Sequence, residues 1–347
     1  PIILGNLERI PSSTANVTNA IYGVDGSPVV KDIYFDDTPH DGTNNPRWRT
    51  ILIGGLGAGG NGIYSVDITD INNPTHLFAI KNDPSNREIS HWNTAGVKNI
   101  YSYGTGNIAS ELNYSKLGET WSTPRIIRIK VNGKDKWVAV FGAGYNAAVN
   151  PDIGSAVYVL DIENEGKLLK DIDITDQVNV MHNYVFGIPR GNSKTEISLG
   201  QYGLQSYNVN CCKVRVSGAG DIRYTVTGTL NGDTMSKLKI NFDRAPDNVT
   251  ITASVVNKTD IINALPADLS VITADSASKA NYDGAIVYAS DLEGKITKIN
   301  LTENFSLNNN LISNISSTTL FNSQSTSDNG RYIYTRPEVT INNDNNL

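Results

Sequence analysis

The feature that most constrains the fold is a glycine-rich hairpin signature at residues 48–69, because it recurs along the chain. Two β-type runs, 51–53 and 63–68, flank a turn in which most residues tolerate positive φ. This pattern predicts a β-hairpin. A second copy occupies residues 137–162, and a fainter third copy occupies residues 284–301. The recurrence predicts a protein built from similar β units.

The glycine turn also matches a nucleotide-binding pattern. Gly55, Gly57 and Gly60 fit G-x-G-x-x-G, and a predicted strand precedes them. That motif requires a helix next, because the pyrophosphate rests on the helix N-terminus. β-type residues follow Asn61-Gly62 instead. We therefore favour a hairpin turn over a dinucleotide site.

Each hairpin copy follows a segment that opens with a proline or lies next to one. Pro28 and Pro124 open two such strands, a third round begins at residues 265–269, and a fourth begins at residues 335–339. The intervals from Pro28 to Pro124 and from there to Pro266 approximate two and three units of about 47 residues, near the length of one propeller blade. We predict an all-β fold, a modified β-propeller of about seven blades, some of them degenerate. A pair of immunoglobulin-like sandwiches is the alternative, but it would not explain the recurring glycine and Asp-Ile patterns.

One stretch, residues 178–262, fits the repeat poorly. We interpret it as a β-rich insertion or as degenerate blades within a single propeller domain that spans residues 1–347. The stretch contains the only two cysteines, Cys211 and Cys212, which are adjacent. They are either two thiols or a vicinal disulfide, which an oxidising compartment would allow.

Composition excludes several classes of function. The net charge of −6 argues against a nucleic-acid-binding face, which needs a basic stripe. No apolar run approaches the roughly 20 residues of a membrane-spanning helix. The four histidines show no metal-ligand spacing, and the sequence has no nucleophile elbow or P-loop. We therefore assign no catalytic residues. The chain begins at Pro1 rather than Met, as an excised domain would.

Closely spaced acidic and amide side chains suggest calcium, which takes six to eight oxygen ligands. Asn281, Asp283 and the following Gly284 resemble the middle of an EF-hand-type loop, with Asp275 before them and Asp291 after the next predicted strand. Calcium is thus a candidate cofactor, and a solvated acidic turn is the alternative. A second candidate cluster lies nearer the N-terminus and comprises Asp36, Asp37, Asp41 and Asn44.

Several sequence blocks resemble the C-terminal domain of the PilC/PilY family of type IV pilus-associated proteins. The blocks occur in the family's order at residues 48–60, 117–124, 288–294 and 336–339. The resemblance implies a modified β-propeller on the bacterial cell surface, at the pilus tip or in the outer membrane. It implies a role in pilus biogenesis that opposes retraction, in twitching motility and in adherence and virulence. The implied partners are pilins or minor pilins and a host-cell or surface receptor.

The resemblance also bears on the metal site and on the class of function. Family members can bind calcium in an Asp-rich loop shortly before a strand that corresponds to Tyr288–Asp291 here, which favours Asp275, Asn281, Asp283 and Asp291 as ligands. We therefore expect a non-enzymatic binding module. The alternative is a quinoprotein-type dehydrogenase propeller. Four tryptophans are too few for the regular docking motifs of that class.

Overall fold

The computed structural model describes most of the chain. The described residues are Ile2 and the ranges 21–35, 47–104, 108–145, 153–174, 180–188, 194–198, 212–217, 223–231, 234–244, 249–257, 264–273, 284–313, 315–323, 325 and 329–339. The chain divides into two compact units: unit 1 is Pro1–Thr175 with Ile261–Leu347, and unit 2 is Asp176–Asp260. Each unit is described by itself.

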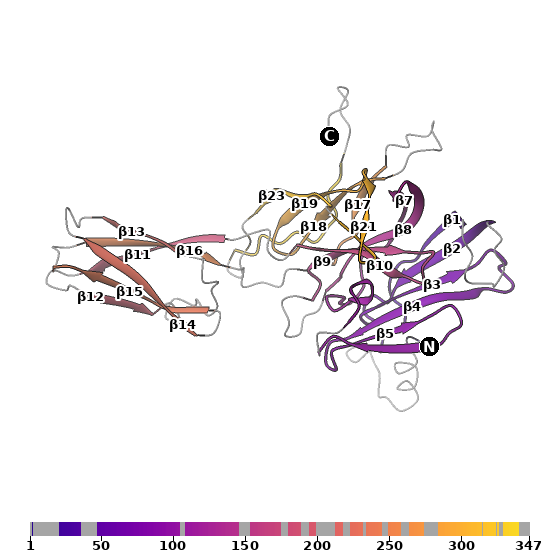
Figure 1. Cartoon of the computed structure of the whole chain (residues 1–347), viewed down its shortest axis with the longest axis horizontal. Coiled ribbons are helices and arrows are strands. Elements are labelled where there is room, and N and C mark those ends of the chain that lie inside the picture. Colours follow the sequence, from indigo (N-terminus) through magenta and orange to yellow (C-terminus); the bar gives the residue numbers. More distant parts are fainter. Residues whose placement is uncertain are drawn as a thin grey trace, which may run out of the picture. The chain divides into compact units, whose positions relative to one another are not determined.

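Among the described residues of unit 1, the regular secondary structure is almost entirely β-strand (Figure 1). Its first strands are β1 (Val29–Phe35), β2 (Arg47–Gly55), β3 (Gly62–Asp67), β4 (Thr75–Asp83), β5 (Glu88–Trp92), β6 (Lys98–Ser102), β7 (Arg125–Val131), β8 (Lys134–Gly142), β9 (Ala156–Asp161) and β10 (Lys167–Asp173). After unit 2 follow β17 (Ser270–Ile272), β18 (Ile286–Ser290), β19 (Lys295–Asn300), β20 (Asn304–Phe305), β21 (Leu307–Asn308), β22 (Leu311–Ile312) and β23 (Ser317–Asn322).

Three sheets of unit 1 repeat one order, and we call them blades 1 to 3. Blade 1 runs β1-β2-β3-β4-β5-β6, blade 2 runs β7-β8-β9-β10, and blade 3 runs β17-β18-β19-β23. Neighbouring strands within each blade are antiparallel, and β20 adds to β7 as a parallel strand. Consecutive antiparallel strands are what blade-length repeats produce.

The predicted hairpins form at all three copies. β2 pairs with β3 so that Gly55 faces Ile63, β8 pairs with β9, and β18 pairs with β19. Because the strand β3 follows the glycine turn, the helix that a dinucleotide motif needs is absent there. The segment near residue 110 forms a single 3₁₀ turn, Ser110–Leu112. Within the described residues, no helix is both long and apolar enough to cross a bilayer.

Blade 2 is buried on both faces, which explains its continuous apolar runs. All six residues of β9 are buried. Tyr158 and Leu160 belong to a core shared with blade 1, whereas Val157 and Val159 belong to a core shared with blade 3. Side chains alternate across a strand, so a strand covered on both sides needs apolar residues at every position. The blades therefore stack face to face through two cores.

The glycine turns also join successive blades. Isolated bridges link Gly57 to Thr120 and Gly144 to Leu265, so the turn of one blade meets the segment that leads into the next. In blade 3 the Ser290 hydroxyl donates to the carbonyl of Thr335 at 2.6 Å. Residues 331–336 therefore take the place of a lead-in segment. The strand expected to open a fourth round at 335–339 does not form within the described residues, which are irregular there.

The described residues of unit 2 form two three-stranded antiparallel sheets. Its strands are β11 (Val180–Ile188), β12 (Lys194–Ser198), β13 (Cys212–Ser217), β14 (Tyr224–Asn231), β15 (Thr234–Phe242) and β16 (Val249–Asn257). The sheet orders are β11-β16-β13 and β12-β15-β14, drawn as two layers in Figure 1. None of β11, β12 and β13 pairs with the next strand along the chain, whereas each blade pairs its first three strands consecutively, which favours the insertion over degenerate blades. That residues 178–262 interrupt one propeller domain stays a prediction.

Candidate functional site

The predicted calcium loop connects β17 to β18 in blade 3. Asp275, Asn281 and Asp283 lie outside the described residues. The loop rejoins the sheet at Gly284, whose backbone N–H donates to the carbonyl of Arg128 at 2.6 Å. That carbonyl belongs to β7 of blade 2. The downstream end of the loop is thus held at a junction between two blades.

Asp291 lies at the opposite end of β18, in the turn that leads to β19. Its carboxylate accepts a hydrogen bond from the backbone N–H of Lys295 at 3.0 Å. The Lys295 ammonium lies 3.3 Å from Asp291 Oδ2 and 3.0 Å from Glu293 Oε2. It also donates to the carbonyl of Ile174 at 2.8 Å. We call Asp291, Glu293 and Lys295 the buried charge cluster, since Lys295 is 0% exposed and Asp291 1%.

The electrostatics of this cluster do not fit a calcium ligand. Burial raises the pKa of Asp291 from 3.8 to about 6, and the positive charge of Lys295 opposes that rise. A divalent cation at the Asp291 carboxylate would lie against the Lys295 ammonium, and like charges in a low-dielectric site repel strongly. Across the described parts of the chain, no three His, Cys, Asp or Glu side chains are grouped as a metal site would require. We therefore separate Asp291 from the three loop residues.

Other predicted sites fall beyond what the structure describes. The second acidic cluster, Asp36, Asp37, Asp41 and Asn44, lies outside the described residues, as does Cys211. Cys212 opens β13, but its side chain is not described.

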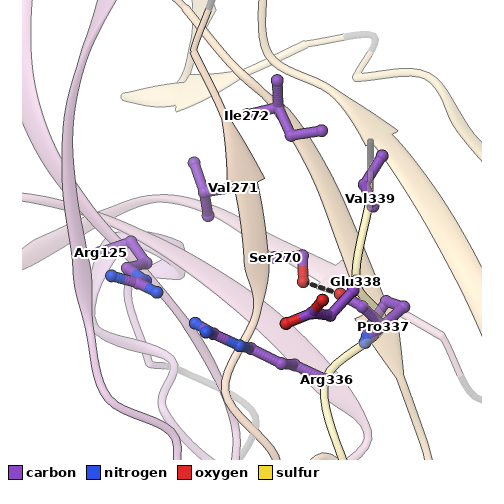
Figure 2. Close-up of a pocket in the computed structure, with 8 residues that line it drawn as sticks. All are labelled: Arg125, Ser270, Val271, Ile272, Arg336, Pro337, Glu338 and Val339. Atoms are coloured by element: carbon purple, nitrogen blue, oxygen red, sulfur yellow. Dashed lines mark hydrogen bonds between the residues drawn. The ribbon is translucent and has the colours of Figure 1, made fainter. Parts of the chain in front are cut away.

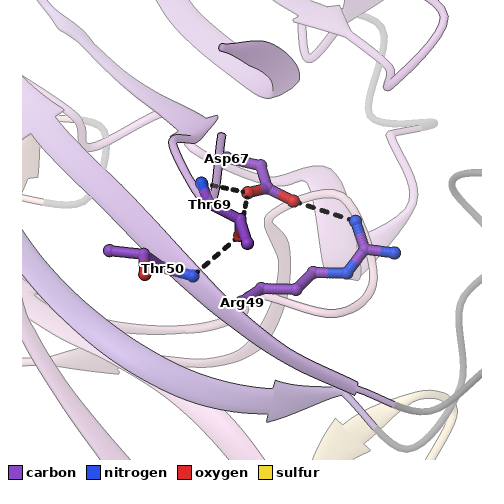
Figure 3. A network of polar contacts seen from close by, with 4 residues as sticks. All are labelled: Arg49, Thr50, Asp67 and Thr69. Carbon is purple, nitrogen blue, oxygen red and sulfur yellow. Dashed lines mark hydrogen bonds and ion pairs between the residues drawn. The ribbon is translucent and has the colours of Figure 1, made fainter. Parts of the chain in front are cut away.

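A buried ion pair joins β2 and β3 of blade 1 at the end of the hairpin opposite the glycine turn (Figure 3). Arg49 Nη1 lies 2.9 Å from Asp67 Oδ2, and the two side chains are 4% and 8% exposed. The other carboxylate oxygen of Asp67 accepts from the backbone and hydroxyl of Thr69 at 2.9 and 2.5 Å. The Thr69 hydroxyl in turn accepts from the backbone N–H of Thr50 at 2.9 Å. This network fixes where β3 ends.

The same position keeps a cation and an aspartate in blade 2 and loses both in blade 3. In blade 2, Lys136 Nζ lies 2.5 Å from Asp161 Oδ2. In blade 3, Asn300 replaces the aspartate and accepts from the backbone and hydroxyl of Thr302 at 3.0 and 2.7 Å. By the strand register, the cation's place in blade 3 is taken by Gly284. The blade that lost the cation therefore also lost the anion, which avoids an unpaired buried charge.

A pocket of about 270 Å³ lies beside the first strands of blades 2 and 3, β7 and β17 (Figure 2). Arg336 extends toward Arg125, and the Glu338 carboxylate lies between Arg336 and Ser270. The Ser270 hydroxyl donates to the carbonyl of Pro337. The pocket is lined by Arg125, Ser270, Val271, Ile272, Arg336, Pro337, Glu338 and Val339. Sequence reasoning missed this site, although the recurring proline-led segments carried the signal.

Comparison with known proteins identifies a family with the same repeated β architecture. A family model described as the PilY1 beta-propeller domain matches residues 6–185, which is just over half of the chain. The chain belongs to this family. The expected all-β propeller class and the PilC/PilY resemblance are thereby confirmed.

The matched relatives are much longer than this chain. The type IV pilus biogenesis factor PilY1 of Pseudomonas aeruginosa strain PAO1 is 27% identical over 175 residues, which covers 50% of this chain and 10% of the relative. A PilY1 homolog of Xylella fastidiosa strain Temecula1 is 27% identical over 161 residues, 46% of this chain and 8% of the relative. The crystal structure of the Pseudomonas aeruginosa PilY1 C-terminal domain is matched with a TM-score of 0.33 and 20% identity, over 88% of this chain and 52% of that chain.

Proposed function

We propose that this chain is the propeller module of a type IV pilus biogenesis protein and that it works by binding rather than by catalysis. The observation that carries the proposal is the match of residues 6–185 to the PilY1 propeller family. Its matched relatives are named as type IV pilus biogenesis factors. The module acts on the bacterial cell surface, at the pilus tip or in the outer membrane.

The proposed mechanism is mechanical and adhesive. Blade 2 is buried on both faces, so neighbouring blades cannot slide without exposing apolar surface. A stack of this kind presents its loops in fixed positions, and loops on rigid scaffolds are common binding surfaces. One set of loops binds pilins or minor pilins and opposes pilus retraction. Other loops bind a host cell or surface, which supports adherence, twitching motility and virulence.

Calcium is proposed to tune this module through the loop that holds Asp275, Asn281 and Asp283. Oxygen ligands at this spacing suit calcium, and the loop rejoins the sheet at the held residue Gly284. When bound, the ion would supply a fixed positive charge that draws the loop's oxygens together. Asp291 is left out, because its carboxylate faces Lys295.

Genetic replacement in the source bacterium tests the pilus role. The strain carries the complete protein with a blade-disrupting change such as Gly144→Ala in this module, and surface pili are counted. We expect fewer pili and reduced twitching, with pili restored when the retraction motor is also removed. The exposed change Lys134→Gln is the control and should leave piliation normal. Normal piliation with a demonstrably unfolded module would refute the role.

Calorimetric titration tests the calcium proposal separately. We expect saturable binding to the 347-residue chain that Asp283→Ala abolishes and that the exposed hairpin change Asp135→Ala preserves. Binding that survives in Asp283→Ala would exclude this loop and direct attention to the Asp36 and Asp41 cluster. An absence of binding at millimolar calcium would make the module independent of calcium.

A further inference from the structure

The pocket in Figure 2 is assembled from the openings of successive blades. Arg125 is the first residue of β7, and Ser270 is the first residue of β17. Glu338 follows Pro337 as Arg125 follows Pro124, so it occupies the corresponding place in the segment after blade 3. Three equivalent positions from distant parts of the chain therefore meet at one cavity.

The charged groups in this pocket have no partners within the described residues. Arg125 Nε is buried and has no hydrogen-bond partner there. No ion pair joins Arg125, Arg336 or Glu338 to another described side chain. The guanidinium of Arg49, by comparison, forms an ion pair with Asp67 at 2.9 Å. A buried guanidinium nitrogen without a partner is costly, so an oxyanion that reaches it gains that energy on binding.

The charge and the walls of the pocket narrow the class of ligand. Two guanidinium groups and one carboxylate leave a net charge of +1, which suits a monoanion better than a dianion. Guanidinium forks match the geometry of a carboxylate. Val271, Ile272 and Val339 supply an aliphatic wall beside the charges. At about 270 Å³ the cavity is slightly smaller than most ligand sites, so it suits one or two residues of a peptide.

We propose that this pocket binds the C-terminal carboxylate of a peptide whose last residue is aliphatic. Arg125 and Arg336 hold the carboxylate oxygens, and Val271 and Val339 contact the aliphatic side chain. Glu338 excludes phosphate, because a dianion would face its negative charge. The proposal goes beyond the pilus role and requires no calcium.

Titration of the 347-residue chain with acetyl-Ala-Gly-Val tests this site. The matched ligands are the peptide with a free C-terminal carboxylate, the same peptide as its C-terminal amide, and inorganic phosphate. We expect the acid to bind about ten- to a hundredfold more tightly than the amide, the range expected for hydrogen bonds to charged groups. Phosphate should bind more weakly than the acid.

Variants separate the pocket from general charge effects. Arg336 is exposed, so Arg336→Gln should leave the thermal transition unchanged while it weakens binding of the acid at least about tenfold. Lys134→Gln removes one exposed positive charge at the opposite end of the β7–β8 hairpin from Arg125 and should leave binding unchanged. Glu338→Gln should raise the affinity for phosphate. Equal binding of acid and amide, no binding of the acid at millimolar concentration, or unchanged affinity in Arg336→Gln would overturn the proposal.

Discussion

The ammonium of Lys295 lies 3.3 Å from the carboxylate of Asp291, and both side chains are buried at the start of β19. The same ammonium lies 3.0 Å from Glu293 and donates to the carbonyl of Ile174. One cation therefore contacts two carboxylates and ties the hairpin turn of blade 3 to Ile174, the residue that follows β10. The charged turn between β18 and β19 is therefore buried, and it connects blade 3 to the residue after β10.

Removal of that cation should destabilise unit 1. Lys295→Met leaves Asp291 and Glu293 buried without their counter-charge, and breaking a buried ion pair costs about 3–5 kcal/mol. The free energy of unfolding from urea titration measures this loss. Lys134→Met, at an exposed hairpin position, should change it by less than about 0.5 kcal/mol. Equal effects of the two substitutions would contradict the assigned role of Lys295.

Asp291 should also give stability a pH dependence of unusual sign. Its pKa is raised from 3.8 to about 6 in the folded chain, so between these values the folded state binds more protons than the unfolded state. Its contribution to stability is therefore full below about pH 4 and is lost as the pH rises through about 6. In Asp291→Asn this contribution is absent. Unfolding free energies of both proteins from pH 4 to 7 should differ in slope, and parallel curves would exclude the shift.

The buried pair of blade 1 should matter far more than an exposed pair of blade 2. Arg49→Met leaves the Asp67 carboxylate buried, with an expected loss of about 3 kcal/mol. Lys130 lies 3.3 Å from Asp135, but both side chains are 41% exposed. Lys130→Met should therefore cost at most about 1 kcal/mol. A double-mutant cycle with Asp67→Asn should show coupling between residues 49 and 67, and additive effects would argue against it.

Two glycines separate backbone strain from a steric clash at the blade junction. Gly133 has a φ of +76° and no atom within 4 Å of an added Cβ, so Gly133→Ala should cost only about 1–2 kcal/mol of conformational strain. Gly144 has a φ of +90°, and an added Cβ would lie 1.9 Å from the carbonyl oxygen of Glu119. Gly144→Ala must also displace the segment at residues 117–124, which precedes the first strand of blade 2, because the added Cβ would overlap it. Thermal unfolding should show the larger loss for Gly144→Ala, and equal losses would mean that the junction yields freely.

Much of the local architecture could be predicted from residue patterns. The hairpins at 48–69 and 137–162 form where β-type runs flank turn residues that tolerate positive φ. The resemblance to the PilC/PilY family could likewise be drawn from short blocks, because those blocks carry the repeat. The prediction of a strand at 335–339 was wrong, because these described residues are irregular. An extended segment becomes a strand only when a neighbouring strand offers hydrogen-bond partners along its length.

The candidate sites were harder to predict. Asp291 has the residue type and the position of a calcium ligand, yet its carboxylate faces Lys295. Lys295 follows four residues later, but the sequence did not show that both side chains are buried against each other. The roles of Asp275, Asn281 and Asp283 stay predictions.

The β-hairpins and their repeat follow from the sequence, because β-type runs and turn chemistry act over a few residues. Which faces are buried and which charges meet depends on the folded unit. Arg125 and Arg336 share a pocket, and Lys295 reaches the carbonyl of Ile174, because stacked blades bring distant segments together. Those contacts depend on packing across two cores, and packing energy is a property of surfaces that form only when the whole unit folds.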